Sequence, residues 1–185
     1  MTICLVGSEM CIRDSDGTVN EYASGVTAGE VVTDALGKKH GCLAARINNV
    51  ERDLSTPLTD DCDVEGILAE SDEGIHILRH SAAHLLAQAV MELYPDAKPT
   101  IGPAIDRGFY YDFAMEPIGE GDLKPIEKKM HEIARRNLKV ERVELDDQEL
   151  REHFTSNPYK IEIIDDNWED GDGSTIYKQG EWYDL

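Results

Sequence analysis

Two histidines, His80 and His84, lie four residues apart in a stretch whose other residues favour a helix. On a helix, residues at this spacing share one face and have β-carbons within roughly 6 Å of each other. Their imidazoles can therefore converge on one metal ion, water molecule or ester carbonyl group, while Leu85 and Leu86 pack away from them. Half-buried structural histidines also occur at this spacing, so the pair alone leaves both interpretations open.

The residues that follow favour the functional interpretation. Residues 101–112 read IGPAIDRGFYYD, and residues 159–161 read YKI. With the histidine pair, these motifs occur in the order found in the editing domain of bacterial-type threonyl-tRNA synthetases. From about Asp16 to Leu185 the chain resembles the two amino-terminal domains of that family, of which the editing domain is the second.

The resemblance implies that this region hydrolyses serine wrongly esterified to the tRNA for threonine. It assigns His80 and His84 to binding of the terminal adenosine and of the reacting ester or its water. Lys160 falls on the family's catalytic lysine, and Asp184 on an aspartate that positions water and recognises the amino group. Taken alone, Lys160 would be interpreted as a solvated strand residue and Asp184 as a residue without a role.

Two tyrosines complete the expected site. Tyr110 and Tyr111 are similar to aromatic residues that line the family's substrate pocket. Side chains alternate along a strand, so only one of the two can point inward. Core packing is the ordinary role of such residues, and we expect it for at least one of them.

The resemblance also sets the expected cofactors. Directly after Asp184 the family continues into a CxxxH motif, and in related alanyl-tRNA editing domains HxxxH and CxxxH together hold zinc. The sequence contains only the HxxxH half of that ligand set, so we predict no metal site in this region. We expect ATP, magnesium and zinc only in the catalytic core of a parent enzyme, and we expect the chain to be a fragment whose truncated site is inactive.

The charge and hydropathy of the chain limit which kinds of partner it could bind. With 38 acidic and 18 basic residues, the formal net charge is −20, which argues against unaided binding to nucleic-acid phosphates. We therefore expect other parts of a homodimeric parent to hold the mischarged acceptor end of tRNA. The one basic stretch, residues 122–142, is either a solvated helix face or an RNA-facing helix. No apolar run approaches the roughly 20 residues that span a bilayer, and the four cysteines show no metal-ligand spacing, so we expect a cytoplasmic protein without a membrane partner.

The predicted fold class is α+β with two domains. Residues 1–15 resemble a translated sequencing adapter and are interpreted as a non-native leader, although Met10 and Ile12 alternate well enough to imitate a first strand. Residues 16–70 resemble a TGS domain, a ubiquitin-like β-grasp fold. We expect it to contain an extended stretch at 18–22, a helix capped by Thr27 and Glu30, and a hairpin around Asn48-Asn49.

Residues 71–185 are expected to form the editing domain, with a long HxxxH helix packed on an antiparallel sheet. The expected helices are 75–93, the basic stretch, and 147–154. The expected strands are 109–113, 139–145, 159–164 and 175–177.

Two other classes of function compete with an editing hydrolase. The acidic balance and the absent CxxxH motif suit a non-catalytic module that only binds tRNA or a protein. A regulatory nucleotide hydrolase with a TGS domain is disfavoured, because the sequence has no GxxxxGK phosphate loop.

Overall fold

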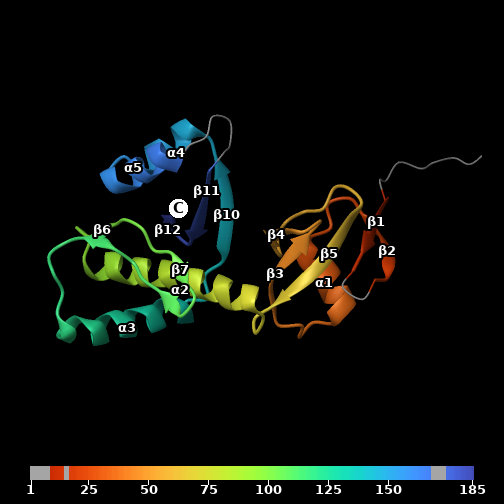
Figure 1. Ribbon diagram of the computed structural model, residues 1–185, viewed down its shortest axis with the longest axis horizontal. Coiled ribbons are helices and arrows are strands. Elements are labelled where there is room, and N and C mark those ends of the chain that lie inside the picture. Colours follow the sequence, from red (N-terminus) through yellow and green to blue (C-terminus); the bar gives the residue numbers. More distant parts are fainter. Residues whose placement is uncertain (1–8, 15–16, 168–173) are drawn as a thin grey trace, which may run out of the picture. The chain divides into compact units, whose positions relative to one another are not determined.

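The computed structural model describes residues 9–14, 17–167 and 174–185. By its contacts the chain divides into two compact units, Met1–Leu78 and Arg79–Leu185. Both combine helices with β-structure, which agrees with the predicted α+β class (Figure 1). The division falls within helix α2 (Asp72–Leu93), whereas the sequence predicted a boundary between residues 70 and 71.

The described part of unit 1 contains one complete helix, the first turns of α2 and a five-stranded sheet. The helix is α1 (Ala28–Leu36), and the strands follow the spatial order β2-β1-β5-β3-β4. β1 runs parallel to β5, and the other neighbouring pairs are antiparallel. The strand bounds are β1 (Glu9–Arg13), β2 (Val19–Ala23), β3 (Cys42–Ile47), β4 (Val50–Asp53) and β5 (Cys62–Leu68).

The local signals in unit 1 are confirmed. The Thr27 hydroxyl accepts a hydrogen bond from the Glu30 amide at 3.3 Å, and the Glu30 carboxylate accepts one from the Thr27 amide at 2.8 Å. This reciprocal capping box starts α1 where it was predicted. Asn48 and Asn49 adopt positive φ values of 48° and 68°, which a tight hairpin between β3 and β4 requires.

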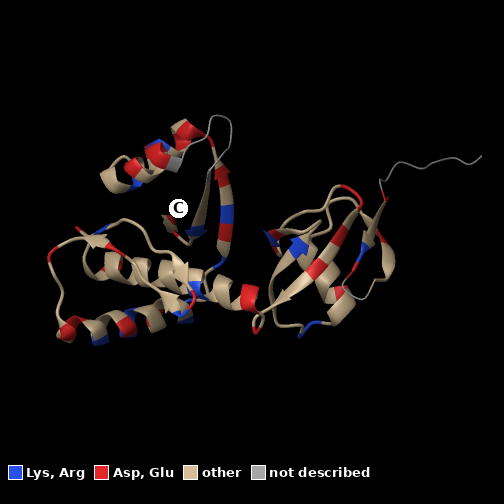
Figure 2. Cartoon of the chain, viewed as in Figure 1, with Lys and Arg blue, Asp and Glu red and all other residues tan. Residues whose placement is uncertain are grey.

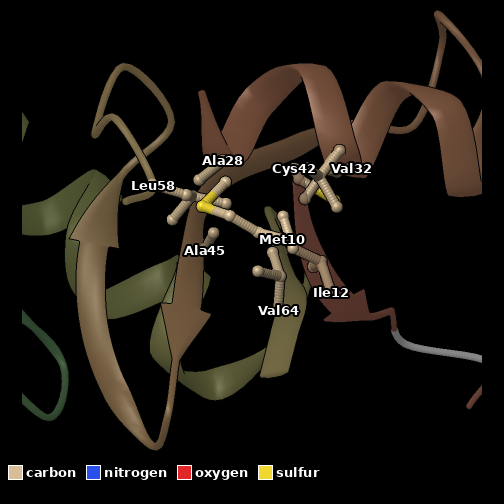
Figure 3. Packing of buried hydrophobic residues seen from close by; sticks show 9 residues of the cluster. Met10, Ile12, Ala28, Val32, Cys42, Ala45, Leu58 and Val64 are labelled. Carbon is tan, nitrogen blue, oxygen red and sulfur yellow. The ribbon is translucent and has the colours of Figure 1, made fainter. Parts of the chain in front are cut away.

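β1 forms within the segment that we interpret as a non-native leader. Met10 and Ile12 point from β1 into the core below α1, among Ala28, Val32 and Val64 (Figure 3). The expectation that their alternation would produce a paired strand is confirmed, since β1 pairs with β2 along its whole length. The adapter origin of residues 1–15 stays a prediction, and residues 1–8 and 15–16 lie outside the described residues.

Unit 2 surrounds the carboxyl-terminal part of α2. A three-stranded antiparallel sheet has the order β10-β11-β12, and two short pairs, β6 with β9 and β7 with β8, follow α2 (Figure 1). The helices after α2 are α3 (Glu120–Arg135), α4 (Asp147–Phe154) and α5 (Pro158–Asn167). The strands are β6 (Lys98–Pro99), β7 (Ala104–Ile105), β8 (Gly108–Phe109), β9 (Phe113–Ala114), β10 (Val140–Leu145), β11 (Ser174–Gln179) and β12 (Trp182–Asp184).

The predicted strand 159–164 is wrong, because this segment forms helix α5. Its alternating isoleucines favoured a strand, but Asn157-Pro158 is a helix start. The Asn157 carbonyl accepts hydrogen bonds from the amides of Lys160 and Ile161, and proline at the first helical position has no amide hydrogen to leave unpaired. Lys160 and Ile164 are buried four residues apart, as on a helix face.

The predicted strand 109–113 is also wrong as one element. Its ends belong to β8 and β9, which pair with different partners, β7 and β6. Phe109 pairs with Ala104, whereas Asp112 exchanges backbone hydrogen bonds with Thr100 and Ile101, next to the β6–β9 pair. The chain therefore changes its pairing partner between these residues instead of continuing along one strand.

Unit 2 has two hydrophobic cores. One packs α4 and α5 on the three-stranded sheet around Leu150, Phe154 and Ile176. The other packs α2 against α3 around Val90 and Ile126. Helix α2 belongs to the second core, and α5 and β12 belong to the first.

The basic stretch is partly neutralised within unit 2. Positive and negative residues alternate along α3 and β10 (Figure 2). Arg136 makes two hydrogen bonds to the Glu92 carboxylate, at 2.7 and 2.8 Å, and Lys129 lies 3.6 Å from the same group. Arg136 and Lys129 thus help to hold α3 against α2. Among the described residues, no helix is long and apolar enough to cross a membrane.

Candidate active site

Helix α2 presents His80 and His84 to each other. Their Nε2 atoms are 2.8 Å apart, and the ring centroids are 4.5 Å apart in an edge-to-face arrangement. A hydrogen bond between two ring nitrogens requires that one of them accept. One Nε2 atom of the pair therefore carries the hydrogen of this bond, and the other supplies the lone pair that accepts it.

Asp184, on β12, lies at the centre of the site. Its side chain receives Lys160 at Oδ1, with 2.6 Å between Nζ and the oxygen, while the Tyr111 hydroxyl donates to Oδ2. Nδ1 of His84 lies 3.3 Å from Oδ2. Asp184 is 1% exposed and Lys160 is 3% exposed. The structure therefore brings together all four predicted catalytic residues, with His80 joined to the carboxylate through His84.

Lys160 owes its place to α5, not to a strand. The ammonium group donates a second hydrogen bond to the Tyr111 hydroxyl, at 3.2 Å. A lysine buried this far needs a compensating charge and hydrogen-bond acceptors. Asp184 and Tyr111 supply both.

The surroundings lower the pKa of Asp184 and raise the pKa of Tyr111. Burial acts to raise the pKa of Asp184, but the His84 ring and the Lys160 ammonium outweigh it, so the pKa lies below its ordinary value. Burial, followed by the negative charge of Asp184, raises the pKa of Tyr111. The site therefore holds a carboxylate and a neutral phenol at neutral pH.

The two predicted pocket tyrosines separate. Tyr111 reaches Asp184, and its ring stacks on Phe113 with centroids 4.9 Å apart. Tyr110 is 47% exposed and is not part of this cluster. Only one of the two adjacent side chains enters the site, as predicted, although residues 110–112 lie between β8 and β9 and not within a strand.

The sequence analysis did not identify two aromatic residues, Tyr177 and Trp182, that lie beside His84. The Tyr177 and Trp182 rings lie 6.0 and 5.9 Å from the His84 ring, and Trp182 also donates to the sulfur of Met91. Tyr177 is paired with Asp184 in the ladder between β11 and β12. Alternation along paired strands was the available signal, because it places Trp182, Asp184 and Tyr177 on one face.

Gln88 was also missed. It lies one helical turn after His84 and is 3% exposed. Its Nε2 donates to Glu92, while Oε1 has no hydrogen-bond partner in the described structure. An acceptor in this state leaves hydrogen-bonding capacity beside the histidine face.

Within residues 9–14, 17–167 and 174–185, no three histidine, cysteine, aspartate or glutamate side chains are grouped to hold an ion. The Nε2 atoms of the two imidazoles bind each other, and Asp184 is held by Lys160. The arrangement suits proton transfer and charge stabilisation.

Comparison with known proteins gives consistent names. The chain is 46% identical over 160 residues to a threonine–tRNA ligase of Thermoplasma acidophilum, which covers 86% of this chain and 24% of the relative. It is 43% identical over 177 residues to one of Rubrobacter xylanophilus, covering 94% and 27%, and 42% identical over 175 residues to one of Streptococcus pneumoniae, covering 92% and 27%. The chain thus spans about a quarter of the length of these curated relatives. No family model matches it.

Proposed function

Because the chain is homologous to the amino-terminal part of threonine–tRNA ligases, we infer that its buried polar cluster is a proofreading site that hydrolyses wrongly charged tRNA. The observation that carries this proposal is the joining of His80, His84, Lys160 and Asp184 in unit 2. The parent protein would join threonine to its tRNA with ATP. This region would remove serine that was attached in error.

A threonine-specific ligase needs such a site for an energetic reason. Serine lacks one methyl group of threonine, and a pocket distinguishes a single methylene or methyl by only about 1–3 kcal/mol. A second site that hydrolyses the wrong ester multiplies that discrimination. Ester hydrolysis requires a positioned water, a proton acceptor and stabilisation of the developing oxyanion.

The residues of the cluster divide this work. A water attacks the ester carbonyl carbon while the accepting Nε2 of the His80–His84 pair takes its proton, which requires the hydrogen bond between the two rings to open. The bond between that carbon and the ribose oxygen then breaks, and the oxygen takes the proton back, which leaves serine and free tRNA. Lys160 supplies positive charge near the oxyanion, and Asp184 holds both Lys160 and the His84 side of the pair in place.

The first unit supports the same assignment. We propose that it is a β-grasp domain of the TGS type, because β1 is parallel to β5 and antiparallel to β2, and α1 covers the core residues of β1. Outside this chain, the parent would carry the ATP, magnesium and zinc sites and the dimer contacts, and would act in the cytoplasm.

The test is hydrolysis of seryl-tRNA by a chimera in which this chain replaces the matching segment of the Rubrobacter xylanophilus relative. We expect hydrolysis of seryl-tRNA, little hydrolysis of threonyl-tRNA, and loss of about 100-fold or more of the rate in His84→Ala, as for removal of a general base. His131→Ala is the matched control, since His131 is exposed on α3. Equal rates in the chimera with and without His84 would overturn the proposal.

One observation favours a non-catalytic binding module instead. Lys160 and Asp184 are almost fully buried and neutralise each other, an arrangement that purely structural ion pairs also adopt. Binding of tRNA by the chimera without any hydrolysis would support this second candidate and reject the first.

A further inference from the structure

The segment Pro99–Gly102 touches the supports of two site residues. On one side, the Pro99 carbonyl accepts a hydrogen bond from the side-chain amide of Asn157, at 2.7 Å. Asn157 is 8% exposed, and its Oδ1 accepts from the backbone amide of Lys160, at 3.4 Å. One buried amide therefore ties the first turn of α5, which carries Lys160, to β6.

On the other side, the same segment locates Tyr111. The amide of Thr100 donates to the Asp112 carbonyl and the amide of Asp112 donates to the Ile101 carbonyl, both at 2.9 Å. A β-carbon added to Gly102 would lie 2.1 Å from Cδ2 of Tyr111. The Tyr111 ring thus occupies space that any side chain at position 102 would fill.

We propose that Asn157 and Gly102 are positioning residues, through which the segment Pro99–Gly102 sets the places of Lys160 and Tyr111 around Asp184. Neither residue touches the reacting groups in this proposal. The proposal rests on the proposed hydrolysis for its kinetic consequence, but its geometric content does not depend on it.

The geometry explains why such a support is needed. Lys160 has a flexible four-carbon stem, so the position of its ammonium follows from where α5 begins and from the acceptors that receive it. Catalytic groups must be held within about 0.5 Å of the productive arrangement. A link that fixes Lys160 and Tyr111 from one backbone segment meets that requirement for both groups together.

Asn157→Asp tests the link most cleanly. The aspartate keeps an oxygen that can cap α5, but it replaces the amide donor by a second oxygen that repels the Pro99 carbonyl. In the chimera we expect kcat for seryl-tRNA hydrolysis to fall by about tenfold to 100-fold with KM within twofold, as expected for a displaced catalytic group. Gln148→Ala, which removes an exposed amide hydrogen bond on α4, should leave both constants unchanged.

A second readout does not need activity. In the chain itself, Lys160 should resist reductive methylation because it is buried, whereas exposed Lys124 and Lys128 should react. In Asn157→Asp we expect methylation of Lys160 to approach the rate of the exposed lysines. Gly102→Ala tests the other support, and it should displace the Tyr111 ring from its buried place and so lower the pH at which Tyr111 ionises.

The outcomes distinguish the positioning roles of Asn157 and Gly102 from the proposed hydrolysis. Loss of Lys160 protection in Asn157→Asp and earlier ionisation of Tyr111 in Gly102→Ala would support the positioning roles even if the chimera hydrolysed no ester. Retained protection together with unchanged Tyr111 ionisation would overturn them, even if the chimera were active. Lower thermal stability alone, with Lys160 still protected, would also reject the proposal.

Discussion

The two units differ in what they bury. Almost all buried side chains of unit 1 are apolar, and Asp14 is its only buried charged or polar residue among those described. In its described part, unit 2 buries five polar or charged side chains: His84, Gln88, Asn157, Lys160 and Asp184. Replacing a buried ion pair by apolar residues is often neutral or stabilising, so folding alone does not explain why unit 2 retains one. Unit 1 is thus held mainly by apolar packing, whereas unit 2 also buries charged groups of the kind that the proposed hydrolysis would use.

The cavities do not follow the same division. A groove of about 310 Å³ lies in unit 1, lined by residues that include Ile47, Leu58 and Cys62. No buried, unpartnered polar group is found among its lining residues in the described structure. Such a group, Oε1 of Gln88, is found instead in unit 2, on the helix that carries the two histidines.

The largest expected effect comes from breaking the buried pair. Lys160→Ala leaves Asp184 buried without its cation, and we expect a loss of about 3–5 kcal/mol in the free energy of unfolding. Lys139→Ala is the control, because Lys139 pairs with Glu141 at an exposed position and should have no measurable effect. Urea denaturation of both variants measures the difference, and equal midpoints would contradict the account.

In unit 1 we expect stability to depend on how closely the apolar core is packed, as we expect it to depend on the buried charges in unit 2. In Gly66→Ala the added methyl would lie 2.6 Å from Sγ of Cys42 and 3.2 Å from Val32, and we expect a loss of about 1–3 kcal/mol from overpacking. Gly121→Ala, in α3, meets nothing within 4 Å and should stabilise by about 0.5–1 kcal/mol. Thermal unfolding would contradict this if both substitutions shifted the midpoint equally.

Acid should weaken unit 2 through Asp184. Its folded pKa lies below the ordinary value of 3.8, so the unfolded state takes up a proton first as the pH falls. The stability that this carboxylate contributes is therefore complete above its ordinary pKa and is lost as the pH falls towards the folded pKa. We expect the difference in unfolding free energy between the wild type and Asp184→Asn to be constant near neutrality and to shrink below about pH 4. A difference that does not change with pH would show that Asp184 has the same pKa in the folded and unfolded states, and would contradict this prediction.

The smallest effect concerns β1. If residues 1–15 are a non-native leader, pairing of β1 adds little stability, and a small β-grasp sheet is the weaker unit. We expect faster amide hydrogen exchange at Cys11 and Ile12 than across Leu85–Val90. The burial of Ile12 in the core makes this a strict test. Equal protection in the two segments would show that the strand is a full member of the fold.

Local chemistry decided how much of the structure was predictable. The capping box at Thr27 and the Asn48-Asn49 turn depend on neighbouring residues, and both formed as predicted. The helix at Lys160 was missed because alternating isoleucines outweighed the Asn157-Pro158 start signal, whose strength depends partly on a bond to distant Pro99. The meeting of Lys160 with Asp184 could be inferred only from family resemblance, since no sequence period links positions on α5 and β12.

The central claim is that unit 2 retains its buried charges for chemistry and not for stability. The direct test replaces the charged pair by apolar residues, Lys160→Met with Asp184→Leu, and adds Tyr111→Phe to remove the hydroxyl that would lose its acceptor. The account predicts that this triple variant recovers most of the stability lost in Lys160→Ala, while seryl-tRNA hydrolysis by the chimera falls about 100-fold or more. Hydrolysis at the wild-type rate, or a triple variant no more stable than Lys160→Ala, would contradict it.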